Sequence, residues 1–138
     1  MNHMSQPEAQ LWKSVKKILE PHNFFLTRIE TQTISGVPDV FGAFDGVGFW
    51  LELKSNKVNY PTLNKYQIVW INRAIKHKLN VLILVRGQKD KALKLYRPRS
   101  FFTDPRTLEP DFIYKNPVDW PLFVDQFKRA VLTGYVAS

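Results

Sequence analysis

The amino-acid sequence predicts an α/β fold in which helices flank a mixed β-sheet. Two apolar segments, Val40–Phe44 and Gly48–Lys54, are joined through Asp45-Gly46, and an Asp-Gly pair between such segments is a strong hairpin signal. A helical pattern follows, and then the continuous apolar run Asn80–Arg86, which is typical of a parallel strand buried on both faces. A chain of 138 residues, 44% of them apolar, is long enough for one compact domain.

The segment before the hairpin is expected to form a helix and then a strand. Ser5 and Glu8 have the spacing of a capping box, and the helix is expected to end near Glu20, before a proline. A first strand is predicted over Phe24–Thr31. Residues 1–3 precede a second methionine, so we treat them as a vector remnant or an alternative start and leave them out of the fold.

The segment after the hairpin is expected to add a helix, two strands and a final helix. Thr62 is the predicted N-cap of a helix over about Leu63–Leu79. The buried run comes next, and Ala92–Arg97 is predicted to be the last strand. A meander followed by a strand–helix–strand crossover gives the mixed sheet.

The sequence from Pro98 to Pro121 is irregular and rich in proline, yet it carries several aromatic residues that need burial. We expect an ordered loop packed on the core, or a contact between two copies of the chain. Asp119 is the predicted N-cap of a C-terminal helix, and Gly134 its C-cap.

The charge composition favours a polyanionic partner. Lysine and arginine total 20 against 12 acidic residues, for a net charge of +8, and cations that neutralise phosphates release condensed counterions. A membrane surface or simple solubility would also be served by this charge. The absence of cysteine excludes disulfides and thiolate zinc sites and fits a cytoplasmic protein. The aliphatic run Val81–Val85 is too short to span a bilayer, and no secretory signal is visible.

The residues most suggestive of chemistry lie on the hairpin. Side chains alternate across a strand, so two faces are predicted: Phe49, Leu51 and Leu53 on one, and Trp50, Glu52 and Lys54 on the other. Asp39 precedes the first hairpin strand and is brought near Glu52 and Lys54. An ion pair on a solvated face would explain Glu52 and Lys54 alone. Two carboxylates at one lysine favour a bound cation instead, because charges in a buried strand need a partner or a ligand.

The string Gly36-Val37-Pro38-Asp39, Glu52-Leu53-Lys54 and Gln67 resembles the PD-(D/E)XK nuclease signature. It is similar to the VRR-NUC branch and, more loosely, to archaeal Holliday-junction resolvases, over roughly residues 5–86. The resemblance implies a restriction-endonuclease-like α-β-β-β-α-β core over about residues 5–97. Residues 98–138 would then add an aromatic extension and a C-terminal helix to the same single domain.

The resemblance also implies divalent-metal hydrolysis of phosphodiester bonds, with Mg²⁺ or Mn²⁺ as cofactor. Asp39, Glu52 and the Leu53 carbonyl would be oxygen ligands of the metal. Lys54 would hold or help deprotonate the attacking water, or stabilise charge on the phosphate. Gln67 would orient the water or Lys54; without the resemblance it would be an ordinary surface glutamine.

Further residues have two interpretations each. Glu8 is explained by helix capping, but a glutamate on the first helix reaches the metal site in the resembled resolvases, where it could serve a second metal. Glu30 could approach the site or lie exposed. Lys57, Lys65 and Arg86 are candidates for contacts with DNA phosphates.

The expected function is a structure-selective DNA endonuclease acting on branched, flapped or four-way junction DNA. The alternatives are a restriction-like or nick-processing nuclease, a catalytically inactive DNA-binding module, and a structural protein with a basic surface. Cutting both strands of a two-fold symmetric junction needs two sites and hence a homodimer. The small size is compatible with a phage or mobile-element origin.

Overall fold

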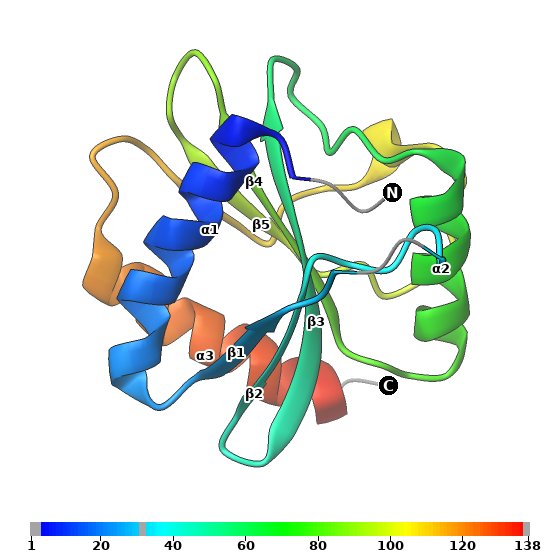
Figure 1. The fold of residues 1–138 in the computed structure, drawn as a ribbon, viewed down its shortest axis with the longest axis horizontal. Coiled ribbons are helices and arrows are strands. Elements are labelled where there is room, and N and C mark those ends of the chain that lie inside the picture. The colour runs from blue at the N-terminus through cyan, green and yellow to red at the C-terminus, as the bar shows by residue number, and fades with distance from the viewer. Residues whose placement is uncertain (1–3, 31–32, 137–138) are drawn as a thin grey trace.

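A computed structural model describes residues 4–30 and 33–136 of the chain (Figure 1). In chain order the elements are α1 (Gln6–Leu19), the 3-10 turn η1 (Glu20–His22), β1 (Phe25–Arg28), β2 (Val40–Phe44), β3 (Val47–Asn56), α2 (Lys65–Lys76), β4 (Val81–Gly87), β5 (Leu93–Tyr96), the 3-10 turn η2 (Pro105–Thr107), β6 (Phe112–Tyr114) and α3 (Trp120–Val136). The six strands form one sheet in sequence order, and only the β3–β4 pair is parallel. None of the described helices is long and apolar enough to cross a membrane.

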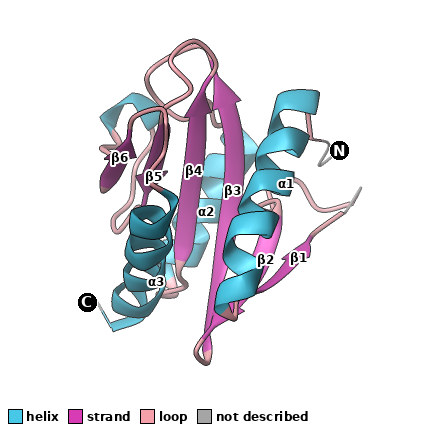
Figure 2. Cartoon of the chain, turned by 90° about the vertical axis from the view of Figure 1, so that its left-hand side faces the viewer, coloured by secondary structure: helices cyan, strands magenta, loops and turns pink. Residues whose placement is uncertain are grey.

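The sheet separates two apolar layers. Helices α1 and α3 lie on one face and α2 on the other, as Figure 2 shows with α1 and α3 in front of the strands. Phe49, Leu51 and Leu53 belong to the core under α1 and α3, and Trp50 packs into the core under α2. The predicted alternation along β3 is therefore confirmed, and it directs Glu52 and Lys54 toward the α2 side.

Helix α1 begins as its sequence predicts. The Ser5 hydroxyl accepts a hydrogen bond from the Glu8 amide at 3.3 Å, and the Glu8 carboxylate accepts one from the Ser5 amide at 3.1 Å. This capping box satisfies two amides that the helix cannot pair internally. The helix ends at Leu19, one residue before the predicted position.

The hairpin also forms as predicted, and its two strands differ in length. Asp45 and Gly46 have φ angles of 52° and 80°, which a two-residue turn with the twist of the strands requires. Strand β2 begins at Val40, opposite Leu51. Strand β3 continues to Asn56, so within the described strands its last five residues, 52–56, pair only with β4. The open edge of β3 beyond Leu51 is where the candidate site lies.

The predicted start of α2 is wrong by two residues. Asn64, not Thr62, is the N-cap: its side chain accepts the Gln67 amide at 2.9 Å, and the Gln67 side chain accepts the Asn64 amide at 3.0 Å. The Thr62 hydroxyl instead donates to the Asn56 side chain at 2.8 Å. The helix ends at Lys76, before Lys78 adopts a left-handed φ of 59°.

The aromatic extension contains a strand that the sequence did not predict. Phe112–Tyr114 pairs with β5, so the strand predicted over Ala92–Arg97, observed as Leu93–Tyr96, is not the last one. Three residues are too few to display a strand period. The first strand, predicted over Phe24–Thr31, is also shorter and covers Phe25–Arg28; Thr31 lies outside the described residues.

Helix α3 begins and packs as expected but ends later. The Leu122 amide donates to the Asp119 side chain at 3.1 Å, which confirms the predicted N-cap. Gly134 lies inside the helix, so its predicted role as C-cap is wrong. Phe123 and Phe127 are fully buried against the sheet, and in the preceding extension Phe102 and Tyr114 are buried in the core while Phe101 is exposed.

Candidate active site

The candidate site lies where β3 extends past the start of β2. Asp39 immediately precedes β2, and its carboxylate accepts a hydrogen bond from the Leu53 amide at 2.9 Å. Glu52 and Lys54 lie on β3, with 3.5 Å between the Lys54 ammonium and a Glu52 carboxylate oxygen. Their side chains are only 3% and 13% exposed, respectively. The structure therefore brings together the three charged residues expected from the sequence.

Gln67 connects this cluster to α2. Its side-chain amide donates to the Glu52 carboxylate at 3.0 Å, while its side-chain carbonyl accepts the Asn64 amide. One side chain thus caps the helix and holds a carboxylate of the site. A capping role for Gln67 was missed because Thr62 was the predicted N-cap.

Gly36 sets the approach of Asp39 to α2. Its φ is 85°, and a Cβ atom there would overlap the Tyr66 carbonyl and lie 2.9 Å from the Gln67 amide nitrogen. Only glycine tolerates both the backbone angle and this approach without strain. The segment leading to Asp39 therefore packs directly against the first turn of α2, and the Asp39 carbonyl accepts the Ile29 amide at 2.7 Å. The sequence contained this glycine, but its packing role needed the structure.

Burial dominates the electrostatics of the two carboxylates. Burial raises the pKa of Glu52 well above its usual value; the neighbouring Asp39 carboxylate raises it further, and Lys54 opposes this rise. Burial also raises the pKa of Asp39, against the opposing effects of the Leu53 amide and Lys54. Two acids share one ammonium in a low-dielectric site, so an additional cation would stabilise their charged forms.

The Leu53 carbonyl faces the same opening. The N–H and C=O groups of one strand residue point to the same edge of that strand. Because the Leu53 amide donates to Asp39 across the open edge of β3, its carbonyl is directed to that edge too. A backbone oxygen is thus available beside the two carboxylates, in the position that the family resemblance implied.

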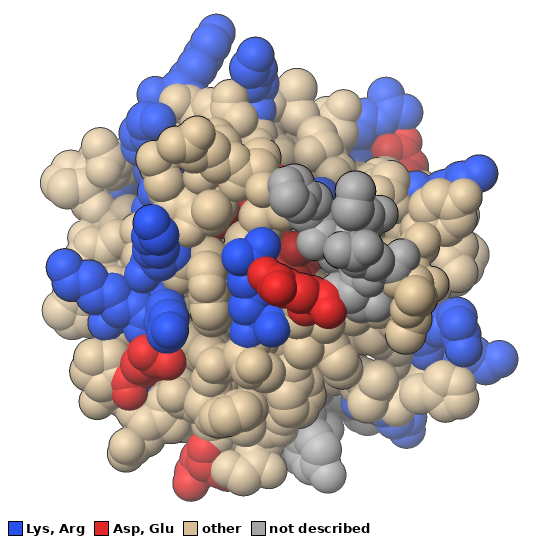
Figure 3. All heavy atoms as spheres, viewed as in Figure 1, with Lys and Arg blue, Asp and Glu red and all other residues tan. Residues whose placement is uncertain are grey.

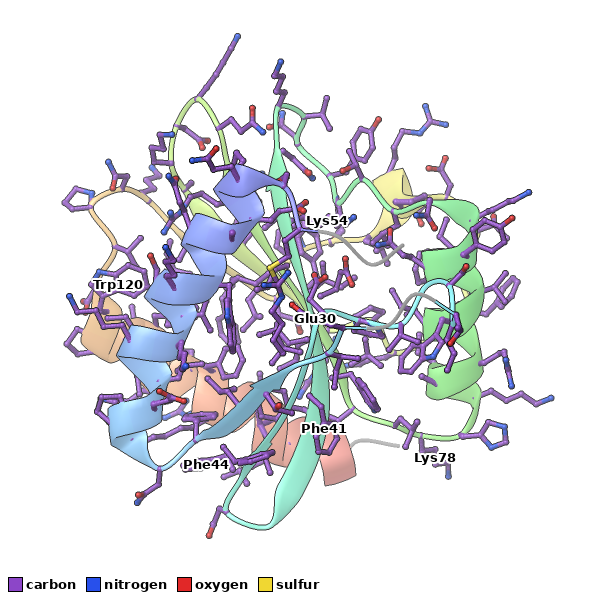
Figure 4. The ribbon with its side chains drawn as sticks, viewed as in Figure 1. Glu30, Phe41, Phe44, Lys54, Lys78 and Trp120 are labelled. Atoms are coloured by element: carbon purple, nitrogen blue, oxygen red, sulfur yellow. The ribbon has the colours of Figure 1, made fainter. Side chains whose placement is uncertain are left out.

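Glu8 and Glu30 differ in their relation to the site. The Glu8 carboxylate caps α1, and its charge also raises the pKa of both Asp39 and Glu52, so the two interpretations of Glu8 are compatible. Glu30 is 71% exposed and lies 3.5 Å from Arg28. Both Glu30 and Lys54 are near the centre of Figure 4, but Glu30 is engaged at the surface.

The three lysine and arginine candidates for DNA contact lie in different places. Lys57 is exposed directly after β3, and Lys65 is exposed on the first turn of α2, over the Tyr66 ring. Arg86 is in register with Ser55, so it points to the sheet face opposite that of Lys54. Figure 3 shows a projecting acidic side chain beside a basic one near the centre of one face, with further acidic atoms set back behind them and other lysine and arginine side chains farther out on the same face.

The donors fit a hard divalent cation. Two carboxylates and a backbone carbonyl are the oxygen ligands that Mg²⁺ or Mn²⁺ prefers, with waters and a substrate phosphate completing the shell. Among the described residues no group of three or more His, Cys, Asp or Glu side chains gathers closely enough to hold a metal by itself. An ion here would depend on waters and substrate for its remaining ligands.

No family model matches the chain, and no curated protein matches its sequence. Among solved structures, Archaeoglobus fulgidus Hjc, a Holliday junction resolvase from an archaeal hyperthermophile, superposes with a TM-score of 0.56 at 14% identity, covering 86% of this chain and 98% of that one. The structure of SSO0001 aligns over 91% of this chain and 57% of that one at 11% identity, with a TM-score of 0.34, which is too low to indicate a shared fold. The similarity to Hjc confirms the predicted nuclease-like α/β fold. The VRR-NUC branch stays a prediction.

Proposed function

We propose that this chain is a divalent-metal-dependent DNA endonuclease that hydrolyses phosphodiester bonds. The observation that carries the proposal is the pair of carboxylates formed by the buried Glu52 and the half-buried Asp39, beside Lys54 at the open edge of β3. This arrangement occurs in a chain that shares its fold with a Holliday junction resolvase.

In this proposal Asp39, Glu52 and the Leu53 carbonyl hold Mg²⁺ or Mn²⁺. The ion, when bound, polarises the phosphoryl oxygen and makes a bound water more acidic. Lys54 places its ammonium beside the phosphate and stabilises the negative charge that develops there, or positions the attacking water. Gln67 restrains the Glu52 carboxylate through its 3.0 Å hydrogen bond. If a second ion takes part, Glu8 would be its candidate ligand.

We infer that the substrate is branched DNA, with four-way junctions as the first candidate. Hjc is a Holliday junction resolvase, and the net charge of +8 suits a polyanion. Cutting a two-fold symmetric junction in both strands requires two sites, so we propose that the chain acts as a homodimer. Such an enzyme would act in the cytoplasm.

The same fold could host a restriction-like or nick-processing nuclease, or a DNA-binding module without activity. The pairing of Asp39 with the buried Glu52 argues against an inactive module. Two neighbouring carboxylates that are largely withdrawn from water cost stability unless a cation neutralises them, and a protein that only binds DNA gains nothing from that cost.

The test is a panel of labelled four-way junction, flap, splayed, single-stranded and linear duplex DNA, incubated with Mg²⁺, with Mn²⁺ or with a chelator. We expect metal-dependent cleavage that is strongest on branched substrates. Asp39→Asn should reduce the rate by at least about 100-fold, since it removes a charged ligand of the ion that would polarise the reacting phosphate, while leaving DNA binding intact. Turnover by Asp39→Asn equal to the wild type, or cleavage in chelator, would contradict the proposal.

A further inference from the structure

A second concave site lies beyond the candidate active site, at the carboxyl ends of β3 and β4. Its cavity measures about 190 Å³. The two strand ends lie side by side at the top of both Figure 1 and Figure 2. Of the described residues that line the cavity, three are lysines and one is an acid: Lys57, Lys89, Lys94 and Asp90. Val85 forms part of its floor. The cavity therefore carries a net positive charge over an apolar floor.

Strand register connects this cavity to the active site. Lys54 on β3 is in register with Val85 on β4, which is in register with Lys94 on β5. Residues in register across neighbouring strands point to the same sheet face, so Lys54 and Lys94 share the α2 side. Two strand spacings separate them, about 10 Å. Val85 lies between the two lysines in this register and is one of the residues that line the cavity, so the cavity neighbours the candidate active site.

Buried polar contacts hold the rim of the cavity in place. Asn56 is buried at the end of β3; its side chain donates to the Tyr60 carbonyl at 2.6 Å and accepts from Thr62 at 2.8 Å. On the facing loop, the Gln88 amide donates to the Asn56 carbonyl at 2.8 Å, and its side chain donates to the Ser55 carbonyl at 3.1 Å. The loop that carries Lys57 and the loop that carries Lys89 are thus tied to each other.

The lysines themselves are available for a ligand. Within the described residues none of the three forms an ion pair. Asp90 is engaged locally, because its carboxylate accepts the Ala92 amide at 3.0 Å. Lysine ammonium groups act as point charges that suit phosphate oxygens.

We propose that this cavity is a subsite for a backbone phosphate of the DNA strand that is cut, next to the scissile phosphate, which would bind at the candidate active site beside Lys54. The inference rests on the proposed nuclease function. Phosphate contacts fix the register of a protein on its substrate. The subsite would therefore select which bond reaches the metal, and the cut strand must continue past the scissile bond over the ends of β3 and β4.

The test compares Lys94→Gln and Lys89→Gln with Lys78→Gln, a matched control whose exposed lysine precedes β4, at the end of that strand away from the cavity, and lies well below Lys54 in Figure 4. Junction binding is measured by fluorescence anisotropy in chelator over a series of salt concentrations. Loss of one phosphate contact should weaken binding a few-fold and flatten the slope of log affinity against log salt by about 0.9. Lys78→Gln should change neither.

A second measurement uses junctions that carry one neutral methylphosphonate at successive positions around the cut. One position should weaken wild-type binding as much as Lys94→Gln does and add nothing in that variant, because both changes remove the same contact. The subsite would be contradicted if Lys94→Gln and Lys89→Gln both left the salt slope unchanged. It would also be contradicted if the effects of the methylphosphonate and of Lys94→Gln were additive at every position. Absence of cleavage with this coupling intact would instead overturn only the nuclease activity.

Discussion

Glu52 is held by two neighbours at once, an ammonium 3.5 Å away and a glutamine amide 3.0 Å away. These contacts orient its carboxylate but leave it buried beside a second acid. The residues at this site thus give up stability for the ability to bind a cation, a compromise common where activity needs a strained or charged site.

This compromise predicts that Glu52→Gln stabilises the metal-free protein at neutral pH. The pKa of Glu52 is raised in the folded state, so the folded chain binds more protons than the unfolded chain once pH exceeds the ordinary glutamate value. Stability is therefore lost as pH rises from that value through the folded-state pKa. The neutral variant avoids this loss, and Lys54 keeps Asp39 as its counter-charge.

Thermal unfolding in chelator should show a midpoint higher by about 3 °C or more at neutral pH, with the difference shrinking toward acidic pH. Cleavage should be abolished in the same variant. A midpoint below that of the wild type at neutral pH would mean that the ion pair with Lys54 outweighs the burial of charge.

At the level of elements, the site depends on the contact between the segment entering β2 and the first turn of α2. Gly36 and Gly46 allow a matched comparison, since their φ angles are 85° and 80° and only Gly36 has neighbours that a Cβ would meet. Both alanine variants carry the cost of a left-handed backbone, about 1 kcal/mol. Gly36→Ala must in addition displace the Tyr66 carbonyl.

We therefore expect Gly36→Ala to lose a further 1 kcal/mol or more, on the order of the penalty for backbone strain. It should also lose cleavage, because Asp39 and Gln67 move apart. Gly46→Ala should keep wild-type cleavage. Chemical denaturation and junction cleavage measure both quantities, and equal behaviour of the two variants would show that the approach to α2 is unimportant.

Sequence patterns predicted those elements whose signals are long or chemically distinctive. The Asp45-Gly46 turn, the capping box at Ser5 and the apolar run of β4 each have a local physical cause. The convergence of Asp39, Glu52 and Lys54 follows from strand alternation and the turn together. Strand β6 could not be found, because its pairing depends on β5, a partner distant in sequence.

The start of α2 shows why capping residues mislead. Thr62 and Asn64 are both good N-caps, and the choice between them depends on Asn56, which takes the Thr62 hydroxyl. The packing role of Gly36 also depends on a residue distant in sequence. Its neighbour Tyr66 lies on α2, which follows the whole hairpin, so no local pattern could indicate the contact.

For the whole molecule, the proposed action on a symmetric junction predicts a dimer with two equivalent sites. Wild-type chains mixed with an excess of Asp39→Asn chains should form hybrid dimers that cut one strand only. Nicked junctions should then accumulate, whereas the wild type alone should yield paired cuts. Sedimentation at assay concentration should give twice the chain mass. A monomer that cuts both strands with equal efficiency in the mixture would contradict this prediction.

The double use of Gln67 has one more consequence. A helix end is normally the part of a helix most prone to fraying, yet here the capping side chain also grips an acid of the site. If that first turn opens, Gln67 moves, and the Glu52 carboxylate loses the hydrogen bond that orients it. An ion bound to Glu52 would therefore make the N-terminal turn of α2 more rigid. The order of this turn would then indicate whether the site holds a metal ion.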